Sequence, residues 1–85
     1  MKRNFFAVFE TDRNLMKASR KLIAVCTSQR TAVSLALNEL IKSKEIKTTE
    51  LAHYRTLLTE QNQTQGFEVN YLIENVEPNK LLKKS

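Results

Sequence analysis

The sequence contains very few of the residues that build cofactor sites, tight turns and crosslinks. It has one glycine, one proline, one cysteine, one histidine and no tryptophan among its 85 residues. A single glycine excludes the Gly-rich phosphate loops of P-loop and dinucleotide-binding proteins. One cysteine and one histidine exclude a Cys/His zinc site and an intramolecular disulfide within one chain. We therefore expect no metal site and no cofactor.

Long hydrophobic runs are also missing. The two main apolar runs, Phe5–Phe9 and Leu22–Cys26, are too short for a membrane span or for the core of a signal peptide. Cys26 lies in the second run, where a buried and inert thiol is expected more often than a reactive one. These absences favour a soluble, cytoplasmic protein that makes no membrane contact.

The residues that are present suit one small domain covering 1–85. Hydrophobic residues make up 41% and charged residues 27% of the chain, which is enough apolar material for one core and too little length for two. Two strands are expected at 5–11 and 21–27, both apolar at alternating positions on both faces. Residues 12–20 form a long, basic connection between them, so the pair is expected to be a hairpin with strand 5–11 central.

Two helices are expected next, at 29–44 and 49–61. Ser28 is well placed to cap the first helix, and Val33, Leu37 and Leu40 belong to its apolar stripe. Leu35 falls outside this stripe, so it either has separate cover or is a lone exposed leucine. In the second helix His53 lies on the polar side, where a solvated histidine is the expected interpretation.

A third strand is expected at 67–77, preceded by a polar loop that ends at Gly66, which is free to take a positive φ. Asn70 is expected on the wet face of this strand, and the alternation slips at 74–76, which suggests a bulge or the strand's end. Residues 78–85 form a tail. The order predicts an α+β fold: a small ββααβ domain with a three-stranded, mainly antiparallel sheet packed by two helices.

The predicted sheet has two apolar faces, and both have to be shielded from water. Because strands 5–11 and 21–27 are apolar on both faces, one layer of helices cannot hide both. Either the second helix covers the second face, or a second copy of the protein does, so a homodimer is a live prediction.

Charge is unevenly distributed along the chain. The net charge is +5, with +6 in residues 1–47, −4 in 48–77 and +3 in 78–85. No acidic residue occurs from Arg13 through Asn38. The basic connection of the hairpin is therefore a candidate surface for phosphates, and a solvated loop that keeps the protein soluble is the plainer interpretation.

A polar recognition patch is the sharper hypothesis for the site. It requires strand 67–77 to begin at the edge of the sheet where strand 5–11 ends, so that the hairpin connection meets the polar loop. The predicted partner-binding residues are Asp12, Arg13, Lys17, Ser19, Arg20, Gln63, Thr64 and Gln65. The alternative is that the glutamines of this loop only satisfy backbone groups.

A catalytic site is not expected. Glu10 and Asp12 could share a proton or bind a metal, but Asp12 is better explained as a turn-opening residue. No nucleophile and base occur at a spacing that supports catalysis. No catalytic residue and no metal ligand is therefore predicted.

The chain resembles an uncharacterised family of short proteins from anaerobic gut bacteria and their phages and mobile elements. The resemblance is carried by Thr11-Asp12, Ser19-Arg20 and, most specifically, by Gln63-Thr64-Gln65-Gly66. It covers nearly the whole chain and implies the same fold and cellular setting. The family has no assigned activity, so the resemblance transfers no catalytic residue.

The sequence thus predicts a non-enzymatic accessory protein that binds a macromolecule through the basic hairpin connection and the polar loop. A protein partner or a homodimer is preferred, with no small-molecule cofactor. Two alternatives stay open: a nucleic-acid-binding protein that uses the basic hairpin, and a small basic hydrolase of the ribonuclease-toxin type.

Overall fold

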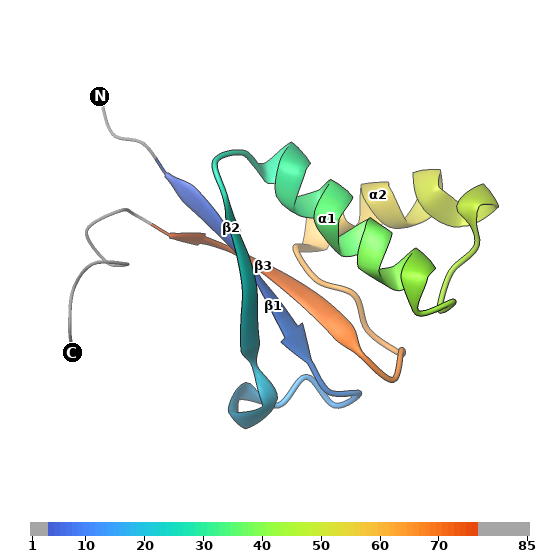
Figure 1. Cartoon of the computed structure of the whole chain (residues 1–85), viewed down its shortest axis with the longest axis horizontal. Coiled ribbons are helices and arrows are strands. Elements are labelled where there is room, and N and C mark those ends of the chain that lie inside the picture. The colour runs from blue at the N-terminus through green and yellow to red at the C-terminus, as the bar shows by residue number, and fades with distance from the viewer. Residues whose placement is uncertain (1–3, 77–85) are drawn as a thin grey trace.

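The chain folds into a three-stranded antiparallel sheet with two helices on one side of it (Figure 1). The structure is a computed structural model that describes residues 4–76. The strands are β1 (Phe5–Thr11), β2 (Lys21–Cys26) and β3 (Asn70–Val76). The helices are α1 (Gln29–Lys42) and α2 (Leu51–Gln61), with 3₁₀ turns η1 (Lys17–Ser19) and η2 (Thr48–Glu50) before β2 and α2. The predicted α+β class and ββααβ order are confirmed.

The central strand is β1, as predicted, with β2 and β3 antiparallel on either side of it. The pairs Thr11↔Asn70 and Glu10↔Lys21 place the end of β1 beside the starts of both neighbours. The hairpin connection and the polar loop therefore reach the same end of the sheet.

An irregularity in β2 explains why this strand is apolar at both alternating positions. Its pairing with β1 passes from Val8↔Ala24 directly to Phe9↔Leu22, which leaves Ile23 as an extra residue. A bulge of this kind changes the direction of a side chain. Ile23 and its neighbour Ala24 both pack against the core on the helix side.

The core lies between the sheet and α1. Ser28 caps α1 as predicted, and its Oγ accepts a hydrogen bond from the Thr31 backbone N–H at 3.2 Å. Val33, Leu37 and Leu40 are fully buried on the inner side of this helix. The second helix packs mainly on α1 rather than on the sheet, as Figure 1 shows.

Leu58 of α2 and Leu35 of α1 also contribute to the hydrophobic core. Leu58 of α2 has no exposed surface. Leu35, which lies outside the main stripe of α1, is half-buried and packs against the same core. It is therefore covered rather than a lone exposed leucine.

Both predicted helices differ from the structure at their ends. The helix expected at 29–44 ends at Lys42, and Lys44 has a φ of 64° that a continuing helix does not allow. Residues 49 and 50, the first two of the second predicted helix, belong to the 3₁₀ turn Thr48–Glu50, and the α-helix starts at Leu51.

The third strand is shorter than expected. It begins at Asn70 rather than at 67, because residues 67–69 form a bend whose backbone bonds to the Asn70 side chain. Its pairing with β1 is regular through Val76, so the bulge suggested at 74–76 is wrong, and the irregularity lies in β2 instead. The predicted tail at 78–85 lies outside the described residues.

The side of the sheet away from α1 and α2, here called the open face, carries apolar side chains that no described element covers. Leu22 is 51% and Val25 45% exposed, whereas most of their apolar neighbours on this face are half-buried and Ala7, at its centre, is fully buried. Strand alternation and register place the following apolar residues on the open face: Phe5, Ala7, Phe9, Leu22, Val25, Leu72 and Val76. The expectation that the second helix covers this face is therefore wrong for the described chain.

None of the helices within residues 4–76 has the length and apolar character needed to cross a membrane.

Candidate interaction site

The hairpin connection, residues 12–20, is organised by its own polar side chains. The Asp12 carboxylate accepts hydrogen bonds from the backbone N–H groups of Asn14 at 3.1 Å and Met16 at 3.0 Å. Ser19 Oγ accepts from the Asp12 backbone N–H at 3.0 Å and donates to the Met16 carbonyl at 2.7 Å. Both side chains thus hold the shape of the connection, which is the turn-opening role expected for Asp12.

Two of the predicted cationic residues are already paired with carboxylates. Arg13 lies 3.0 Å from Glu68, and Arg20 lies 3.3 Å from Glu74 of β3. The Arg13 pair is exposed, and surface pairs of this kind contribute little to stability. The pairing nevertheless reduces the positive charge that the connection offers to a phosphate.

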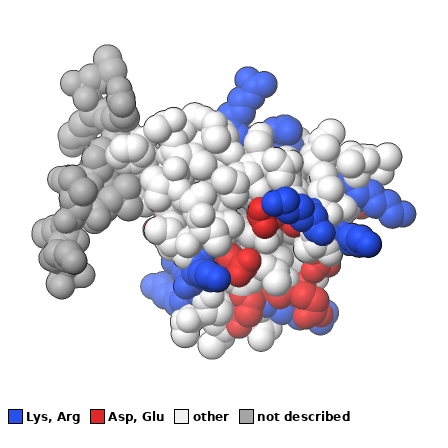
Figure 2. All heavy atoms as spheres, viewed as in Figure 1, with Lys and Arg blue, Asp and Glu red and all other residues white. Residues whose placement is uncertain are grey.

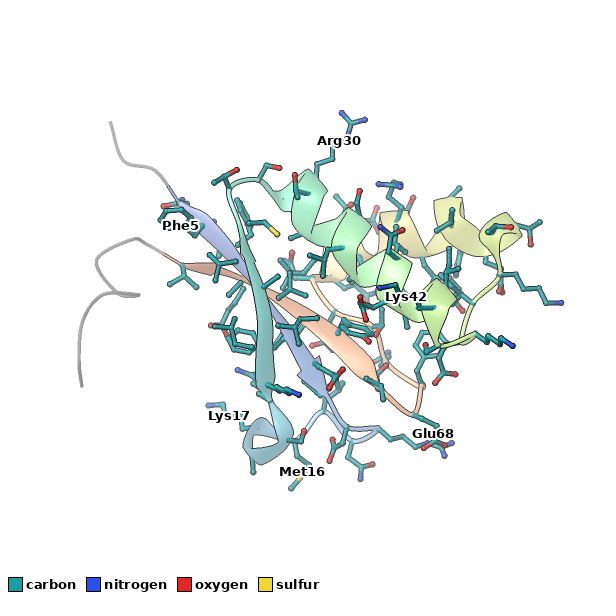
Figure 3. The ribbon with its side chains drawn as sticks, in the orientation of Figure 1. Phe5, Met16, Lys17, Arg30, Lys42 and Glu68 are labelled. Atoms are coloured by element: carbon teal, nitrogen blue, oxygen red, sulfur yellow. The ribbon has the colours of Figure 1, made fainter. Side chains whose placement is uncertain are left out.

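The other Lys and Arg residues include one exposed residue of the connection and those on the face seen in Figure 2. Lys17 is exposed in η1 at the tip of the connection, as Figure 3 shows. On the face seen in Figure 2, the Lys and Arg side chains are spread singly, and several lie beside Asp and Glu. A continuous basic stripe, the usual footprint of a nucleic-acid site, is not seen on that face.

The polar loop packs along the outer edge of β3. The Thr64 backbone N–H donates to the Tyr71 carbonyl at 2.9 Å, and Gln63 forms an isolated bridge with Leu72. Thr64 has no exposed surface, so its side chain is not part of a surface that a partner can reach. Gln65 is exposed, and Gly66 has the positive φ expected of it, at +89°.

Asn70 connects the hairpin connection to the polar loop. Its Oδ1 accepts from Thr64 Oγ1 at 3.0 Å, and its Nδ2 donates to the carbonyl of Phe67 at 2.9 Å. Longer contacts of 3.4 and 3.5 Å reach the carbonyls of Asp12 and Arg13. Asn70 is completely buried, which corrects the expectation that it lies on the wet face.

The predicted site residues are therefore brought to one end of the sheet, but they play different parts. Asp12, Ser19 and Thr64 bond inward and shape the two segments. The residues left at the surface are Arg13, Lys17, Gln65 and, in part, Arg20 and Gln63. Whether these residues bind a partner stays a prediction.

Sequence reasoning missed the residues that tie this region together. No sequence pattern marks Glu68 and Glu74 as ion-pair partners, because their arginines are more than fifty positions away. Asn70 carried one available signal: an asparagine interrupting an apolar strand often marks a buried bond to the backbone.

Arg20 links the hairpin connection to the open face. Its side chain reaches Glu74, which lies on that face between Leu72 and Val76. The Arg20 side chain is 30% and the Glu74 side chain 49% exposed. The Arg20–Glu74 pair is thus a charged feature in an otherwise apolar surface.

Cys26 and His53 lie in different environments, one buried and one exposed. Cys26 is buried, and burial raises the pKa of its thiol, which disfavours the reactive thiolate. His53 is exposed and makes an edge contact with the ring of Tyr54. No group of three metal-ligating side chains occurs in this part of the chain.

Comparisons with known proteins leave the chain without an assigned relative. No family model, no curated protein and no solved structure matches it. The resemblance to short proteins of gut bacteria and their mobile elements therefore stays a prediction that rests on the residues quoted for it.

Proposed function

We propose that the protein is a non-enzymatic interaction protein that self-associates through the open face of its sheet. One observation carries the proposal: the open face exposes apolar side chains on β2, with Leu22 at 51% and Val25 at 45%. Phe5, labelled in Figure 3, extends the same surface at the far end of β1. Exposed apolar side chains grouped on one face of a sheet are a candidate interaction surface.

A second copy of the chain is the occupant that the charges favour. The chain carries a net charge of +5, but the open face holds one cation and one anion, Arg20 and Glu74, and is neutral overall. Two copies that meet there bring apolar surfaces together without facing two net positive charges. Meeting through the remaining, more basic surface would oppose like charges.

Two-fold symmetry also suits the arrangement of the sheet. With a symmetry axis parallel to the strands, β2 of one copy lies over β3 of the other. Arg20 approaches from the β2 side and Glu74 lies on β3, so each can pair with its counterpart in the second copy. Closed, isologous contacts of this type are the commonest in soluble homodimers.

The size of the open face sets the expected strength. Three strands of about seven residues cover roughly 14 Å by 23 Å, or about 330 Å² of flat area. This is well below the ~800 Å² per partner of a standard interface. We therefore expect a weak dimer, with a dissociation constant on the order of 10 µM or higher.

The hairpin connection and polar loop lie at one end of this dimer surface. Their exposed residues Arg13, Lys17 and Gln65 are the proposed contacts for a further protein partner. A single, buried and unpaired cysteine is consistent with a reducing, cytoplasmic setting.

Sedimentation of the full chain from about 10 µM to about 1 mM tests the proposal, because self-association follows mass action. We expect a concentration-dependent dimer for the native chain and a monomer for the Leu22→Lys, Val25→Lys double variant. Met16→Lys is the matched control: Met16 is 54% exposed but lies in the hairpin connection, off the sheet (Figure 3).

The control and a folding check make the outcome decisive. Circular dichroism and thermal unfolding establish that both variants keep the native fold, since both remove exposed apolar side chains. A native chain that stays monomeric at every concentration contradicts the proposal. Equal loss of the dimer in Met16→Lys and the double variant also contradicts it.

A further inference from the structure

A groove lies between α1 and α2, away from the open face. Its volume is about 400 Å³, within the lower part of the range for small-molecule sites. Both helices contribute its walls. The residues that line it are Gln29, Arg30, Val33, Ser34, Arg55 and Thr59.

Side-chain contacts join the two walls of the groove, and its base is backed by the core. Gln29 Nε2 donates hydrogen bonds to the Thr59 carbonyl and to Asn62 Oδ1, both at 3.2 Å, which joins the start of α1 to the end of α2. Val33 is 1% exposed and belongs to the core. The position of the walls is therefore fixed by contacts that a ligand does not have to create.

Two arginines from different helices supply the charge of the groove. Arg55 reaches across from α2, and its guanidinium donates to Ser34 Oγ of α1 at 3.3 Å. Arg30 precedes Ser34 by four residues, so the two lie on the same side of α1. Arg30 is exposed and extends from the start of α1 into solvent (Figure 3).

No carboxylate neutralises these arginines within the described chain. The lining contains no acidic residue, and the ion pairs among residues 4–76 involve Arg13, Arg20 and Lys42 but neither Arg30 nor Arg55. This differs from the hairpin connection, where two arginines are paired. The groove is thus a place where two arginines without a carboxylate partner lie beside the Ser34 hydroxyl.

We propose that this groove binds the phosphate group of a small phosphate ester of about mononucleotide size. A phosphate offers several acceptor oxygens, and guanidinium groups recognise it through two parallel hydrogen bonds. Arg30 and Arg55 bind the phosphate, and the hydroxyl of Ser34, which accepts from Arg55, donates a further bond. The Thr59 hydroxyl already donates to the Arg55 carbonyl at 2.8 Å, so it lines the groove without binding the phosphate. Two cations are too few for tight, non-specific binding along a nucleic-acid backbone.

Titration of the isotopically labelled full chain with adenosine monophosphate, followed by amide chemical shifts, tests the proposal. We expect saturable shifts at residues 29–34, Arg55 and Thr59, with a dissociation constant on the order of 0.1–1 mM. Arg55→Gln and Arg30→Gln should each weaken binding about 3- to 10-fold. Lys44→Gln, which removes one exposed charge at the far end of α1, should leave it unchanged.

Three further probes distinguish the source of the phosphate. Adenosine, which has no phosphate, should not bind, and citrate should bind more weakly than the nucleotide. An oligonucleotide without a terminal phosphate should show no dependence on Arg30 or Arg55.

Absence of saturable shifts overturns the proposal, as does equal weakening in Lys44→Gln and Arg55→Gln. Binding of adenosine or of citrate as strong as that of the nucleotide overturns the assignment to phosphate. Tighter oligonucleotide binding that needs Arg30 and Arg55 assigns the groove to a nucleic-acid backbone and overturns the small-ligand proposal. Because the groove is remote from the open face, these outcomes are independent of whether the protein dimerises.

Discussion

At the scale of single residues, backbone conformation departs from ordinary preferences at the connections between elements. Leu15, Lys44 and Asn62 have positive φ values of 57°, 64° and 61°, in addition to Gly66. Asparagine tolerates this conformation, whereas leucine and lysine adopt it at a cost. The chain uses its single glycine in the polar loop and accepts side chains at the other three positions.

Lys44 follows the end of α1 in a position where glycine is favoured. The Glu45 N–H donates to the Leu40 carbonyl and the Lys44 N–H to the Ile41 carbonyl, each at 3.0 Å. This is the Schellman arrangement, in which the residue at positive φ is usually glycine. Lys44→Gly should therefore raise the free energy of unfolding by about 0.5–1 kcal/mol.

Urea unfolding of the native and Lys44→Gly chains measures this difference. Lys44→Ala is the control, because alanine removes the long side chain but keeps the Cβ that makes positive φ costly. Stabilisation by alanine equal to that by glycine would attribute the effect to the lysine side chain and contradict the backbone explanation.

At the scale of elements, two connections meet at one end of the sheet, and each is held in shape by its own side chains. The hairpin connection is shaped by Asp12 and Ser19, and the polar loop is bonded along the edge of β3 through Thr64. Asn70 joins the two through its side-chain amide. An otherwise open sheet edge is thereby covered over the start of β3.

Asn70→Ala should be strongly destabilising for this reason. The substitution leaves the Phe67 N–H and carbonyl without their side-chain partner. It also removes the acceptor of the Thr64 hydroxyl, although Thr64 Oγ1 still accepts from the Tyr71 N–H. Each unsatisfied buried group costs about 1–3 kcal/mol, and we expect a total loss of about 2–4 kcal/mol. Chemical unfolding measures it, with Asn75→Ala as control because Asn75 is exposed on the same strand.

Hydrogen exchange adds a local measurement to the Asn70 experiment. The amides of residues 62–64 should lose protection in Asn70→Ala before those of β1 do, since the loop depends on Asn70 more directly. A loss of stability no larger than that of Asn75→Ala would show that Asn70 does not hold the loop.

At the scale of the whole molecule, folding brings the basic first part of the chain onto the acidic later part. Arg13 pairs with Glu68 and Arg20 with Glu74, so charges that are separated in the sequence become neighbours. The high positive charge of residues 1–47 is therefore partly neutralised in the fold. Arg30 and Arg55, which line the groove between α1 and α2, take part in none of the ion pairs among residues 4–76.

The stability of the whole molecule should depend on the ionisation of Tyr71. Burial, reinforced by the negative charges of Glu10, Glu39 and Glu45, raises the pKa of Tyr71 to about 12. In the unfolded chain a tyrosine has a pKa of about 10. The neutral phenol is thus favoured by folding, so stability is fully present below pH 10 and is lost as the pH rises toward 12.

Unfolding by urea at several pH values between about 9 and 11 measures this dependence. The native chain should lose more stability over this range than Tyr71→Phe, with a total difference of up to about 2–3 kcal/mol by pH 12. Cys26 is present in both chains, so its ionisation cancels in the comparison. Parallel pH profiles for the two chains would contradict a buried, neutral Tyr71.

Much of the fold was predictable because it depends on local patterns. The apolar period of α1, the Ser28 cap and the continuous apolar run of β1 each encode one element within a few residues. The start of β3 was not predictable in this way. Phe67 and Val69 fit the strand alternation, but the side chain of Asn70 competes for the Phe67 backbone and forms a bend.

The location of the candidate site could be predicted from the sequence, but the burial and ion pairing of its residues could not. The sequence placed Asp12, Arg20 and Thr64 in polar segments, and antiparallel pairing brings those segments to one end of the sheet. It could not show that Thr64 is buried or that Arg20 reaches Glu74, because both facts depend on contacts between distant segments.

The sequence by itself determined the identity and order of the elements, the central place of β1 and the excess of apolar surface on the sheet. These follow from short-range periodicity and from counting apolar positions. Only the tertiary structure decided which face stays open, which charges are paired and where a groove forms between helices. Those features arise when α2 packs on α1 instead of on the second face of the sheet, a choice between surfaces that no local pattern encodes.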